Sequence, residues 1–223
     1  MSELRVAALI SDMDGVLVDT GGVYDRHWEL WAEHHDIPPA RIIAVHFGRP
    51  AAETIRLVAP QLDAVAEARR FNDALAADPS AAGVSAMPGA IELVGAIPPE
   101  RWAIATSAPR TMAERWLAHV GMPLPSVLVT VDDVARGKPA PVPYLRAAEL
   151  LGVAAADCLV IEDAPAGVSA ARAAGATVLG VLSTHGAAHL ADAQHLVAGL
   201  DAVAIRPDGT TGGLLVRWQP APR

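Results

Sequence analysis

The sequence predicts an α/β fold, in which helices cover both faces of a parallel sheet and a small helical domain is inserted near its start. From residue 87 onward, short apolar runs alternate with segments of helical pattern, which is typical of a doubly wound parallel sheet. Between about residues 21 and 86 the pattern is helical throughout. A connection of this length is too long for a simple loop, so we expect a separate helical domain.

The first strand is expected in the apolar run Val6–Ser11, directly before Asp12-Met13-Asp14-Gly15. Asp12 and Asp14 are two residues apart, so they should project together from the carboxyl end of this strand, where such sheets bind ligands. Adjacent carboxylates repel each other unless a cation lies between them or one is protonated. The pair therefore indicates a hard-metal site, a nucleophile beside an acid, or both. A solvated turn that closes a strand is the simpler alternative.

The inserted segment is expected to contain four helices, the second and third opening near residues 38–39 and 50. Residues spaced at helical intervals mark the inner faces of the first and fourth helices. These faces are, in order, Tyr24, Trp28 and Trp31, then Val65, Ala68, Asn72 and Leu75. We interpret the aromatic face as packing between helices rather than as a platform for a ligand.

Regular alternation follows in the rest of the chain. Strands are predicted over residues 102–106, 127–130, 158–161 and 177–182, and helices over residues 109–120, 144–151 and 166–174. The tail is expected to form a hairpin from residues 203–205 and 214–218. It carries no recognisable chemistry.

Polar groups stand at or beyond the ends of four predicted strands. They are Asp12 and Asp14, then Thr106 and Ser107, then Lys138, and then Glu162 and Asp163. The carboxyl ends of parallel strands meet at one edge of the sheet, so these groups should converge. Carboxylates suit Mg²⁺, and a lysine, a hydroxyl and helix N–H groups suit the oxygens of a phosphate.

Composition excludes several classes of protein. The formal net charge of −8 argues against a nucleic-acid-binding surface and against binding to anionic membranes. The single cysteine, Cys158, excludes an internal disulfide and fits a reducing compartment, and its strand position indicates inert packing. No targeting segment or transmembrane run is evident. We expect a soluble, cytoplasmic monomer or homodimer that acts on a small molecule.

Four segments identify a resemblance. LISDMDGVLVDT, AIATSAP, GKPAP and VIEDAPAGVSAARAAG resemble, in order, the four motifs of the haloacid dehalogenase superfamily of phosphotransferases. HFGRPAAETI and MPGAIELV further resemble its sugar- and polyol-phosphate phosphatases. The resemblance implies a Rossmann-like core over residues 1–17 and 87–223 with a four-helix cap over residues 18–86. It also implies a Mg²⁺-dependent phosphatase of a small phosphorylated sugar or polyol.

The resemblance also implies roles for the matching residues. Asp12 would be the nucleophile that forms an aspartyl phosphate, and Asp14 the acid that protonates the leaving alcohol and then activates water. The metal site would draw on Asp12, Asp14 through its backbone carbonyl, Asp163 and Glu162, with Glu162 orienting Lys138 or the waters of the metal. The phosphate or substrate would be bound by Thr106, Ser107, Lys138, Gly15 and, from the cap, Arg49.

The chain departs from the pattern of its relatives at two places. Val142 stands where they usually carry an aspartate after KPAP, which puts the geometry around Lys138 in question. Phe47 separates His46 from Gly48 and Arg49, where relatives tend to read His-Gly-Arg. We therefore expect His46 to be a structural or rim residue, and Arg49 either to contact the substrate or to be a solvated residue at a helix start. His185 and His189 have the spacing of a metal pair, but a surface loop is the better interpretation.

Three other functions compete with the phosphatase. A β-phosphoglucomutase-type isomerase shares the same frame, but Tyr24 stands where those relatives carry a cap histidine, although His27 lies one turn away. A dehalogenase is disfavoured because Asp14 is the acid that phosphate-transferring members need. A non-catalytic binding protein is disfavoured by the intact set of Asp12, Asp14, Lys138 and Asp163.

Overall fold

The computed structural model describes residues 1–46 and 50–221. It divides into two compact units, one formed by Met1–Asp19 with Ser85–Arg223 and the other by Thr20–Val84. The first unit is α/β and the second is helical. The predicted α/β fold is therefore confirmed.

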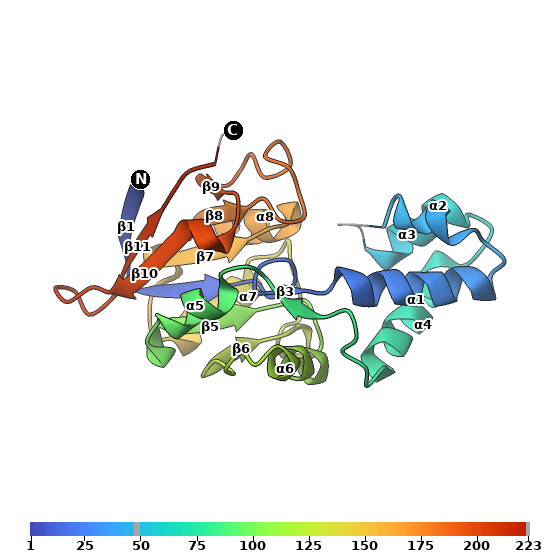
Figure 1. The fold of residues 1–223 in the computed structure, drawn as a ribbon, viewed down its shortest axis with the longest axis horizontal. Helices are drawn as coiled ribbons and strands as arrows, with labels where there is room; N and C mark the ends of the chain where they lie inside the picture. The colour runs from blue at the N-terminus through green and yellow to red at the C-terminus, as the bar shows by residue number, and fades with distance from the viewer. Residues whose placement is uncertain (47–49, 222–223) are drawn as a thin grey trace. The chain divides into compact units, whose positions relative to one another are not determined.

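The main sheet of the α/β unit is parallel throughout its described strands (Figure 1). In spatial order the strands are β6 (Val127–Val129), β5 (Trp102–Ala105), β2 (Ala8–Ser11), β7 (Cys158–Glu162), β8 (Thr177–Val181) and β9 (His195–Val197). Strand β2 pairs with β5 on one side and β7 on the other, so the chain leaves β2 between the ends of both neighbours. Strand β9 was not predicted.

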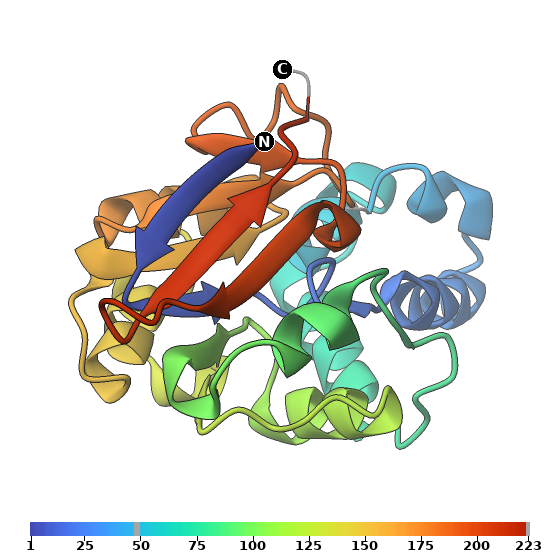
Figure 2. The same cartoon turned by 60° about the vertical axis from the view of Figure 1, so that its left-hand side comes forward.

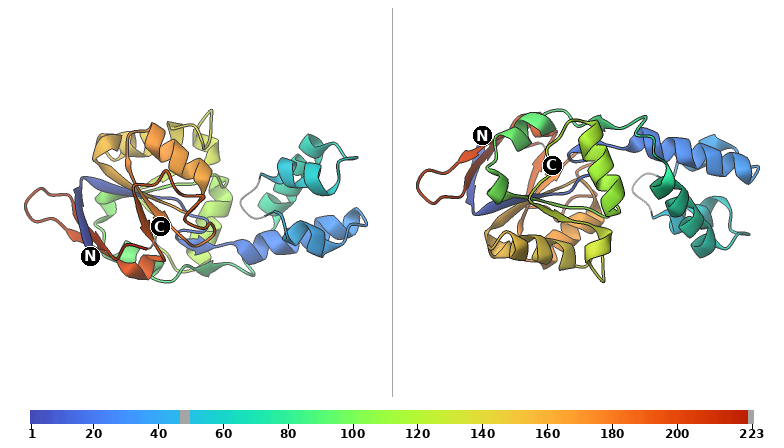
Figure 3. Two further views of the ribbon diagram at one scale, coloured as in Figure 1. Left: turned by 90° about the horizontal axis from the view of Figure 1, so that it is seen from above. Right: turned by 90° about the horizontal axis from the view of Figure 1, so that it is seen from below.

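Helices cover both faces of this sheet, as Figure 3 shows, with α5 (Ala90–Gly95) and α6 (Arg110–His119) on one face and α7 (Val142–Leu150) and α8 (Pro165–Ala173) on the other. Strands β2, β5 and β7 are buried along their whole lengths. A strand that is covered on both faces has no solvent side, which explains why these strands are continuous apolar runs. Short 3₁₀ turns are η1 (Pro99–Arg101), η2 (Val131–Asp133), η3 (Ala155–Asp157) and η4 (Leu200–Ala202).

A separate antiparallel sheet joins the two ends of the described chain (Figure 2). Its order is β1 (Ser2–Val6), β11 (Leu214–Trp218) and β10 (Val203–Pro207), so the predicted hairpin in the tail is confirmed. The predicted strand Val6–Ser11 is wrong at its start, because Val6 belongs to β1 and pairs with Leu214. The chain changes sheets at Ala7, whose N–H donates to Asp157 O over 2.8 Å. A two-stranded ribbon of β3 (Val18–Asp19) and β4 (Ser85–Ala86) was also not predicted.

The helical unit contains α1 (Gly21–His34), α2 (Pro39–Ile43), α3 (Ala51–Val58) and α4 (Ala64–Ala77). The Trp28 ring stacks on Phe71 of α4 with centroids 4.0 Å apart, and Trp31 meets Trp28 edge-on at 5.6 Å. Trp28 and Trp31 of the predicted aromatic face therefore pack in the interior of the helical unit, as predicted, whereas Tyr24 is half-buried. In the described parts of the chain, no helix is both long enough and apolar enough to cross a membrane.

The predicted inner face of α4 is confirmed at Ala68 and Leu75, which are buried, and is wrong at Val65 and Asn72. Val65 is 67% exposed and Asn72 is exposed, whereas the buried stripe is formed by Ala64, Glu67, Ala68, Phe71 and Leu75. The prediction left Glu67 out of the inner face because a charged residue is rarely buried, yet Glu67 faces the core. Its carboxylate accepts hydrogen bonds from Trp31 Nε1 over 3.1 Å and pairs with His35 Nε2 at 3.0 Å, so its burial is compensated.

Candidate active site

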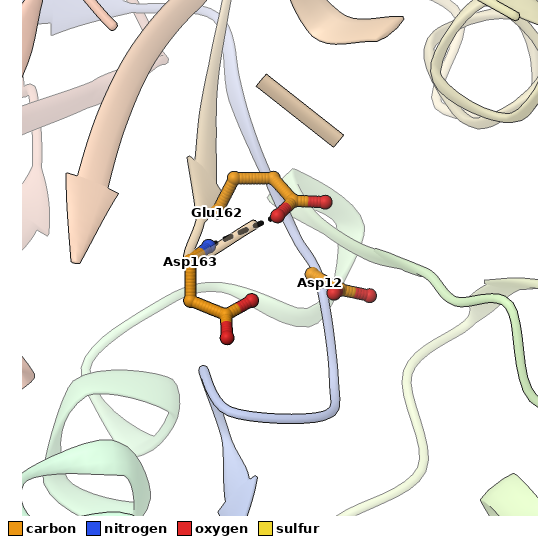
Figure 4. A group of neighbouring side chains, drawn as sticks. All are labelled: Asp12, Glu162 and Asp163. Carbon is orange, nitrogen blue, oxygen red and sulfur yellow. Dashed lines mark hydrogen bonds between the residues drawn. The ribbon is translucent and has the colours of Figure 1, made fainter. Parts of the chain in front are cut away.

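Three acidic side chains gather at the carboxyl edge of the parallel sheet (Figure 4). Asp12 directly follows β2, and its N–H donates to Ile161 O of β7 over 2.9 Å, which holds it beside the end of that strand. Glu162 is the last residue of β7, and Asp163 follows it. All three side chains are buried, and each offers an oxygen within 4.8 Å of the others. The predicted convergence of these strand ends is therefore present.

Lys138 completes this buried cluster. Its Nζ lies 2.7 Å from Asp12 Oδ1 and 2.8 Å from Glu162 Oε1, and its side chain is only 7% exposed. Burial by itself would lower the pKa of Lys138, but the adjacent carboxylates of Asp12 and Glu162 outweigh burial and hold that pKa above its usual value. The side chain is therefore an ammonium ion at any working pH. The ion pair forms although Val142, not an aspartate, begins α7.

The cluster carries more negative than positive charge. Burial, together with Glu162, Asp163 and Asp14, raises the pKa of Asp12 well above its usual range in spite of Lys138. Burial and the Glu162 carboxylate raise the pKa of Asp163 to about 7. The raised pKa values mean that ionisation of Asp12 and Asp163 is unfavourable in the folded protein. A further positive charge beside them would stabilise the ionised carboxylates.

The residues of the cluster fit a hard divalent cation. Asp12 Oδ1 is buried and accepts no hydrogen bond of good geometry within residues 1–46 and 50–221, although the Lys138 ammonium lies close to it. Asp12 and Asp163 supply the carboxylate oxygens that Mg²⁺ prefers, and a dication would balance the excess negative charge.

Glu162 differs from its two acidic neighbours because both of its oxygens are engaged. Oε1 accepts hydrogen bonds from Lys138 Nζ over 2.8 Å and from the Tyr144 hydroxyl over 2.7 Å. Oε2 accepts from the N–H groups of Asp163 and Ala164 over 2.9 and 3.0 Å. This arrangement suits a carboxylate that holds Lys138 better than one that binds a metal directly. Sequence reasoning missed Tyr144, which lies inside a helix and gives no strand-end signal.

Thr106 places a hydroxyl beside the second aspartate. Its Oγ1 donates to Asp14 Oδ2 over 3.3 Å and accepts from the N–H of Ala108 over 3.0 Å. Ser107 follows Thr106 and is exposed, although Thr106 and Ala108 on either side of it are buried. Both predicted residues therefore lie on the loop after β5, and Thr106 is in contact with Asp14.

The loop after β8 also reaches the site, and sequence reasoning missed this loop. Ser183 Oγ donates to the Gly15 carbonyl over 2.6 Å, and the Thr184 hydroxyl donates to Asp163 Oδ2. His185 Nδ1 lies 3.0 Å from Asp163 O, so this histidine packs beside the site. The sequence could have predicted this loop as part of the site, because polar residues follow β8 just as they follow β5 and β7.

Residues 6–175 match the family model of the haloacid dehalogenase-like hydrolases. The chain belongs to this family. Hexitol phosphatase A of Escherichia coli (strain K12) is 34% identical, over 92% of this chain and 98% of that protein. Glycerol-1-phosphate phosphohydrolase 2 of Saccharomyces cerevisiae is 32% identical, over 81% of this chain and 76% of that protein. The solved structure of a HAD family hydrolase from Deinococcus radiodurans R1, with bound phosphate and sodium, has a TM-score of 0.68 at 27% identity, covering 88% of this chain and 93% of that one.

The sequence singled out three further residues, Arg49, His46 and Cys158. Arg49, with Phe47 and Gly48, lies outside the described residues. His46 Nε2 is 2.7 Å from Asp25 Oδ1 inside the helical unit, which is a structural pairing. Cys158 is buried at the start of β7, and burial together with Asp157 raises the pKa of its thiol to about 11. A thiol of that pKa is a poor nucleophile, as predicted.

Proposed function

We propose that this chain is a Mg²⁺-dependent phosphatase of small phosphorylated sugars or polyols, and that it acts through an aspartyl phosphate on Asp12. The hydrolase family supports a phosphoric monoester hydrolase, and the names of the hexitol and glycerol-1-phosphate relatives support the substrate class. One observation carries the proposal most strongly. The buried Asp12 carboxylate lies 2.7 Å from a lysine ammonium, with the carboxyl groups of Glu162 and Asp163 at the same edge of the sheet.

In the first half of the reaction, a carboxylate oxygen of Asp12 attacks phosphorus, and the bond between phosphorus and the ester oxygen breaks. The leaving alkoxide takes the proton of Asp14 and departs as the alcohol, so Asp14 is left ionised. Attack of a carboxylate on a phosphate dianion brings like charges together, and the Lys138 ammonium at Asp12 offsets that repulsion.

In the second half, Asp14 takes a proton from water, and the oxygen of that water attacks phosphorus. The bond between phosphorus and Asp12 breaks, inorganic phosphate leaves, and both aspartates return to their starting states. The hydrogen bond from Thr106 to Asp14 Oδ2 would orient the carboxyl group for both proton transfers. Thr106 and the backbone N–H groups around Ser107 are proposed to bind the phosphoryl oxygens, with Gly15 as a further contact.

Asp12, Asp163 and the backbone carbonyl of Asp14 are proposed to hold the metal ion, and Glu162 to orient Lys138. Bound Mg²⁺ would neutralise charge on the phosphate oxygens and on the nucleophile. The excess of buried carboxylates over Lys138 supports this assignment, since a dication would balance it.

The helical unit Thr20–Val84 is proposed to act as a cap that selects the substrate, with Arg49 among its contacts. The proposal rests on the motif HFGRPAAETI and on the insertion of this unit shortly after Asp14. Substrate should slow hydrogen exchange in residues 16–20 and 84–88, and Arg49→Ala should raise KM more than it lowers kcat. Unchanged exchange and an unchanged KM would contradict a cap role.

The deciding experiment measures phosphate release from a panel of sugar, polyol and glycolytic phosphates, with and without Mg²⁺. We expect Mg²⁺-dependent release from one or a few sugar or polyol phosphates, and a loss on the order of a thousandfold or more in Asp12→Asn. Asp157→Asn is a matched control, because it makes the same change at an exposed position at the other end of β7. Acid-quenched protein should carry hydroxylamine-sensitive phosphate, and Asp14→Asn should retain it longer.

Two outcomes would redirect the assignment. Release that does not need Mg²⁺ or does not need Asp12 would contradict the mechanism. If no member of the panel releases phosphate and the protein converts β-glucose 1-phosphate to glucose 6-phosphate, the proposed activity becomes that of the mutase.

A further inference from the structure

The cluster contains the only lysine of the chain, because every other cationic side chain apart from histidine is an arginine. A lysine ammonium is a compact point charge on a flexible stem, and it lacks the planar fork that orients an arginine. Lys138 is nevertheless buried and points at Asp12. Its direction must therefore be fixed by the groups around it.

Glu162 is the second carboxylate that contacts Lys138, at 2.8 Å. Its Oε2 is anchored by the backbone N–H groups of Asp163 and Ala164, so its carboxylate has little freedom to rotate. Its Oε1 accepts from Lys138 and from Tyr144 together. The hydroxyl and the ammonium thus share one oxygen atom.

Tyr144 brings its hydroxyl to this oxygen from the first turn of α7. The side chain is fully buried, the hydroxyl oxygen is 2.7 Å from Glu162 Oε1, and the ring centroid is 5.2 Å from Lys138 Nζ. Burial and the neighbouring Glu162 raise the pKa of the Tyr144 phenol well above its usual range. A carboxylate only accepts hydrogen bonds, so the phenol is the donor in this contact.

Gly167 also confines the same oxygen. A Cβ atom at this position of α8 would lie 1.6 Å from Glu162 Oε1, so only glycine leaves room for the carboxylate where it stands. Glu162 is thus enclosed by a hydroxyl on α7 and by the bare backbone of α8. A carboxylate enclosed in this way can hold an ammonium in a single position.

We propose that Tyr144 is a positioning residue for the reaction proposed above, because its hydroxyl fixes Glu162 and Glu162 holds Lys138 against Asp12. Removing the hydroxyl leaves a buried charged oxygen with one donor fewer and with no neighbouring solvent to replace it. The Glu162 carboxylate then gains freedom, and the ammonium loses its fixed place at Asp12. Tyr144 itself need not touch the substrate.

The first test does not depend on the activity. Protein labelled with ¹⁵N-lysine carries one lysine side-chain signal, that of Lys138. In the wild type this buried, paired ammonium should exchange its protons slowly enough to be seen at neutral pH. In Tyr144→Phe we expect its exchange rate to rise by about tenfold or more, as expected for the loss of one hydrogen bond to a charged group.

A matched control removes a buried hydroxyl elsewhere. Thr130 Oγ1 donates to the Asp133 carboxylate over 2.8 Å, so Thr130→Val deletes the same kind of hydrogen bond away from Lys138. This variant should leave the ammonium exchange rate and kcat/KM within about twofold of the wild type. Gly167→Ala disturbs Glu162 by overlap with its Oε1 rather than by loss of a hydrogen bond, and it should raise the exchange rate as Tyr144→Phe does. It provides the test if Tyr144→Phe does not fold.

The second test uses phosphatase activity in a double-mutant cycle with Glu162→Gln. Tyr144→Phe should lower kcat/KM about tenfold in the wild type and by less than about twofold in the Glu162→Gln background, because Tyr144 acts through Glu162. Equal losses in both backgrounds would overturn the inference. So would an unchanged ammonium exchange rate in folded Tyr144→Phe. Failure of the proposed function is distinguishable, because a wild type that releases no phosphate would still show the faster exchange in Tyr144→Phe.

Discussion

The Thr106 hydroxyl donates a hydrogen bond to Asp14 Oδ2 over 3.3 Å, although the two residues are 92 positions apart in the sequence. The same hydroxyl oxygen accepts from the N–H of Ala108, so the hydroxyl takes part in two hydrogen bonds. Strands β2 and β5 are neighbours in the sheet, and the contact forms where the chain leaves their carboxyl ends. The proposed acid and the proposed phosphate-binding loop are thereby joined.

Replacing Thr106 with valine should impair turnover while keeping the side-chain shape. Thr106→Val loses both the donor to Asp14 and the acceptor for Ala108, so we expect kcat/KM to fall about ten- to a hundredfold. Thr106→Ser keeps the hydroxyl and should stay within about threefold of the wild type. Steady-state kinetics with the best substrate decides this, and equal losses in the two variants would contradict it.

Mg²⁺ should raise the thermal stability of the wild type, and EDTA should reverse the effect. At a concentration 100 times its Kd, a ligand adds about 2.7 kcal/mol, which corresponds to a Tm increase of about 5 to 10 °C in a chain of this size. Asp163→Asn should lose most of this increase, whereas the exposed Asp192→Asn should keep it. The pKa of Asp163 is raised to about 7 without metal, so protons compete with Mg²⁺ below that pH and the Tm increase should shrink as the pH falls from about 8 to about 6. An equal increase in Asp163→Asn would remove that residue from the metal site.

Gly15→Ala should damage the site beyond its effect on stability. Gly15 has a φ of +74°, and a Cβ atom there would lie 2.1 Å from Asp163 Oδ2. Gly121 is the matched control, because its φ is +69° but its Cβ would meet nothing within 4 Å. Both alanine variants should lose about 1 to 2 kcal/mol from the left-handed backbone, measured by urea unfolding, and only Gly15→Ala should also lose activity and the Mg²⁺ effect on Tm. Loss of activity in both would point to a general effect of strain.

Val142→Asp should stabilise the protein. Val142 is the first residue of α7, whose first turn contains no acidic side chain and whose N-cap residue, Pro141, makes no side-chain cap. A carboxylate at this end of a helix interacts favourably with the helix dipole, by about 0.3 to 1 kcal/mol. Val142→Asn is the control, because asparagine has the shape of aspartate without its charge. It should give less than half of the increase in unfolding free energy that Val142→Asp gives. Urea unfolding at low and high salt measures both, and a gain that survives high salt would contradict the electrostatic explanation.

Asp208 should make the fold sensitive to acid. Hydrogen bonds from Thr210 and Thr211, together with the nearby Arg5, lower the pKa of Asp208 to about 2. A carboxyl group whose folded pKa lies below its unfolded value stabilises the fold above the unfolded pKa of about 4, and this contribution is lost as the pH falls toward about 2. The difference in unfolding free energy between the wild type and Asp208→Asn should therefore be largest above about pH 4 and should shrink toward about pH 2. A difference that does not change with pH would contradict this.

The sheet edge was predictable because its signal is local. Each of Asp12, Thr106 and Asp163 stands at the end of an apolar run, and the rule that parallel strands share an edge converts these separate positions into one place. The sequence also places Lys138 at this edge, beyond the end of a predicted strand, but its role required the motif resemblance, because it lies in an irregular segment. The structure places it 2.7 Å from Asp12 without the aspartate that relatives carry at position 142.

The remainder depends on contacts that no local pattern encodes. Tyr144 looks like a core aromatic residue on an apolar helix face, and only the neighbouring carboxylate makes its hydroxyl important. Glu67 was left out of the predicted inner face of α4, because its burial depends on Trp31 of α1 and on His35, which follows α1. Val6 was assigned to the wrong sheet because its partner, Leu214, lies at the far end of the chain.

The pairing of β1 with β11 also orders events during synthesis on the ribosome. Strand β1 ends at Val6, but its partner begins only at Leu214, so the growing chain must wait for most of translation before this sheet can form. At about 5 to 20 residues per second, the delay is on the order of ten to forty seconds. The helical unit Thr20–Val84 is complete long before then and can fold while the core is still being made. During this interval β1 is an unpaired strand, exposed to chaperones and to other nascent chains.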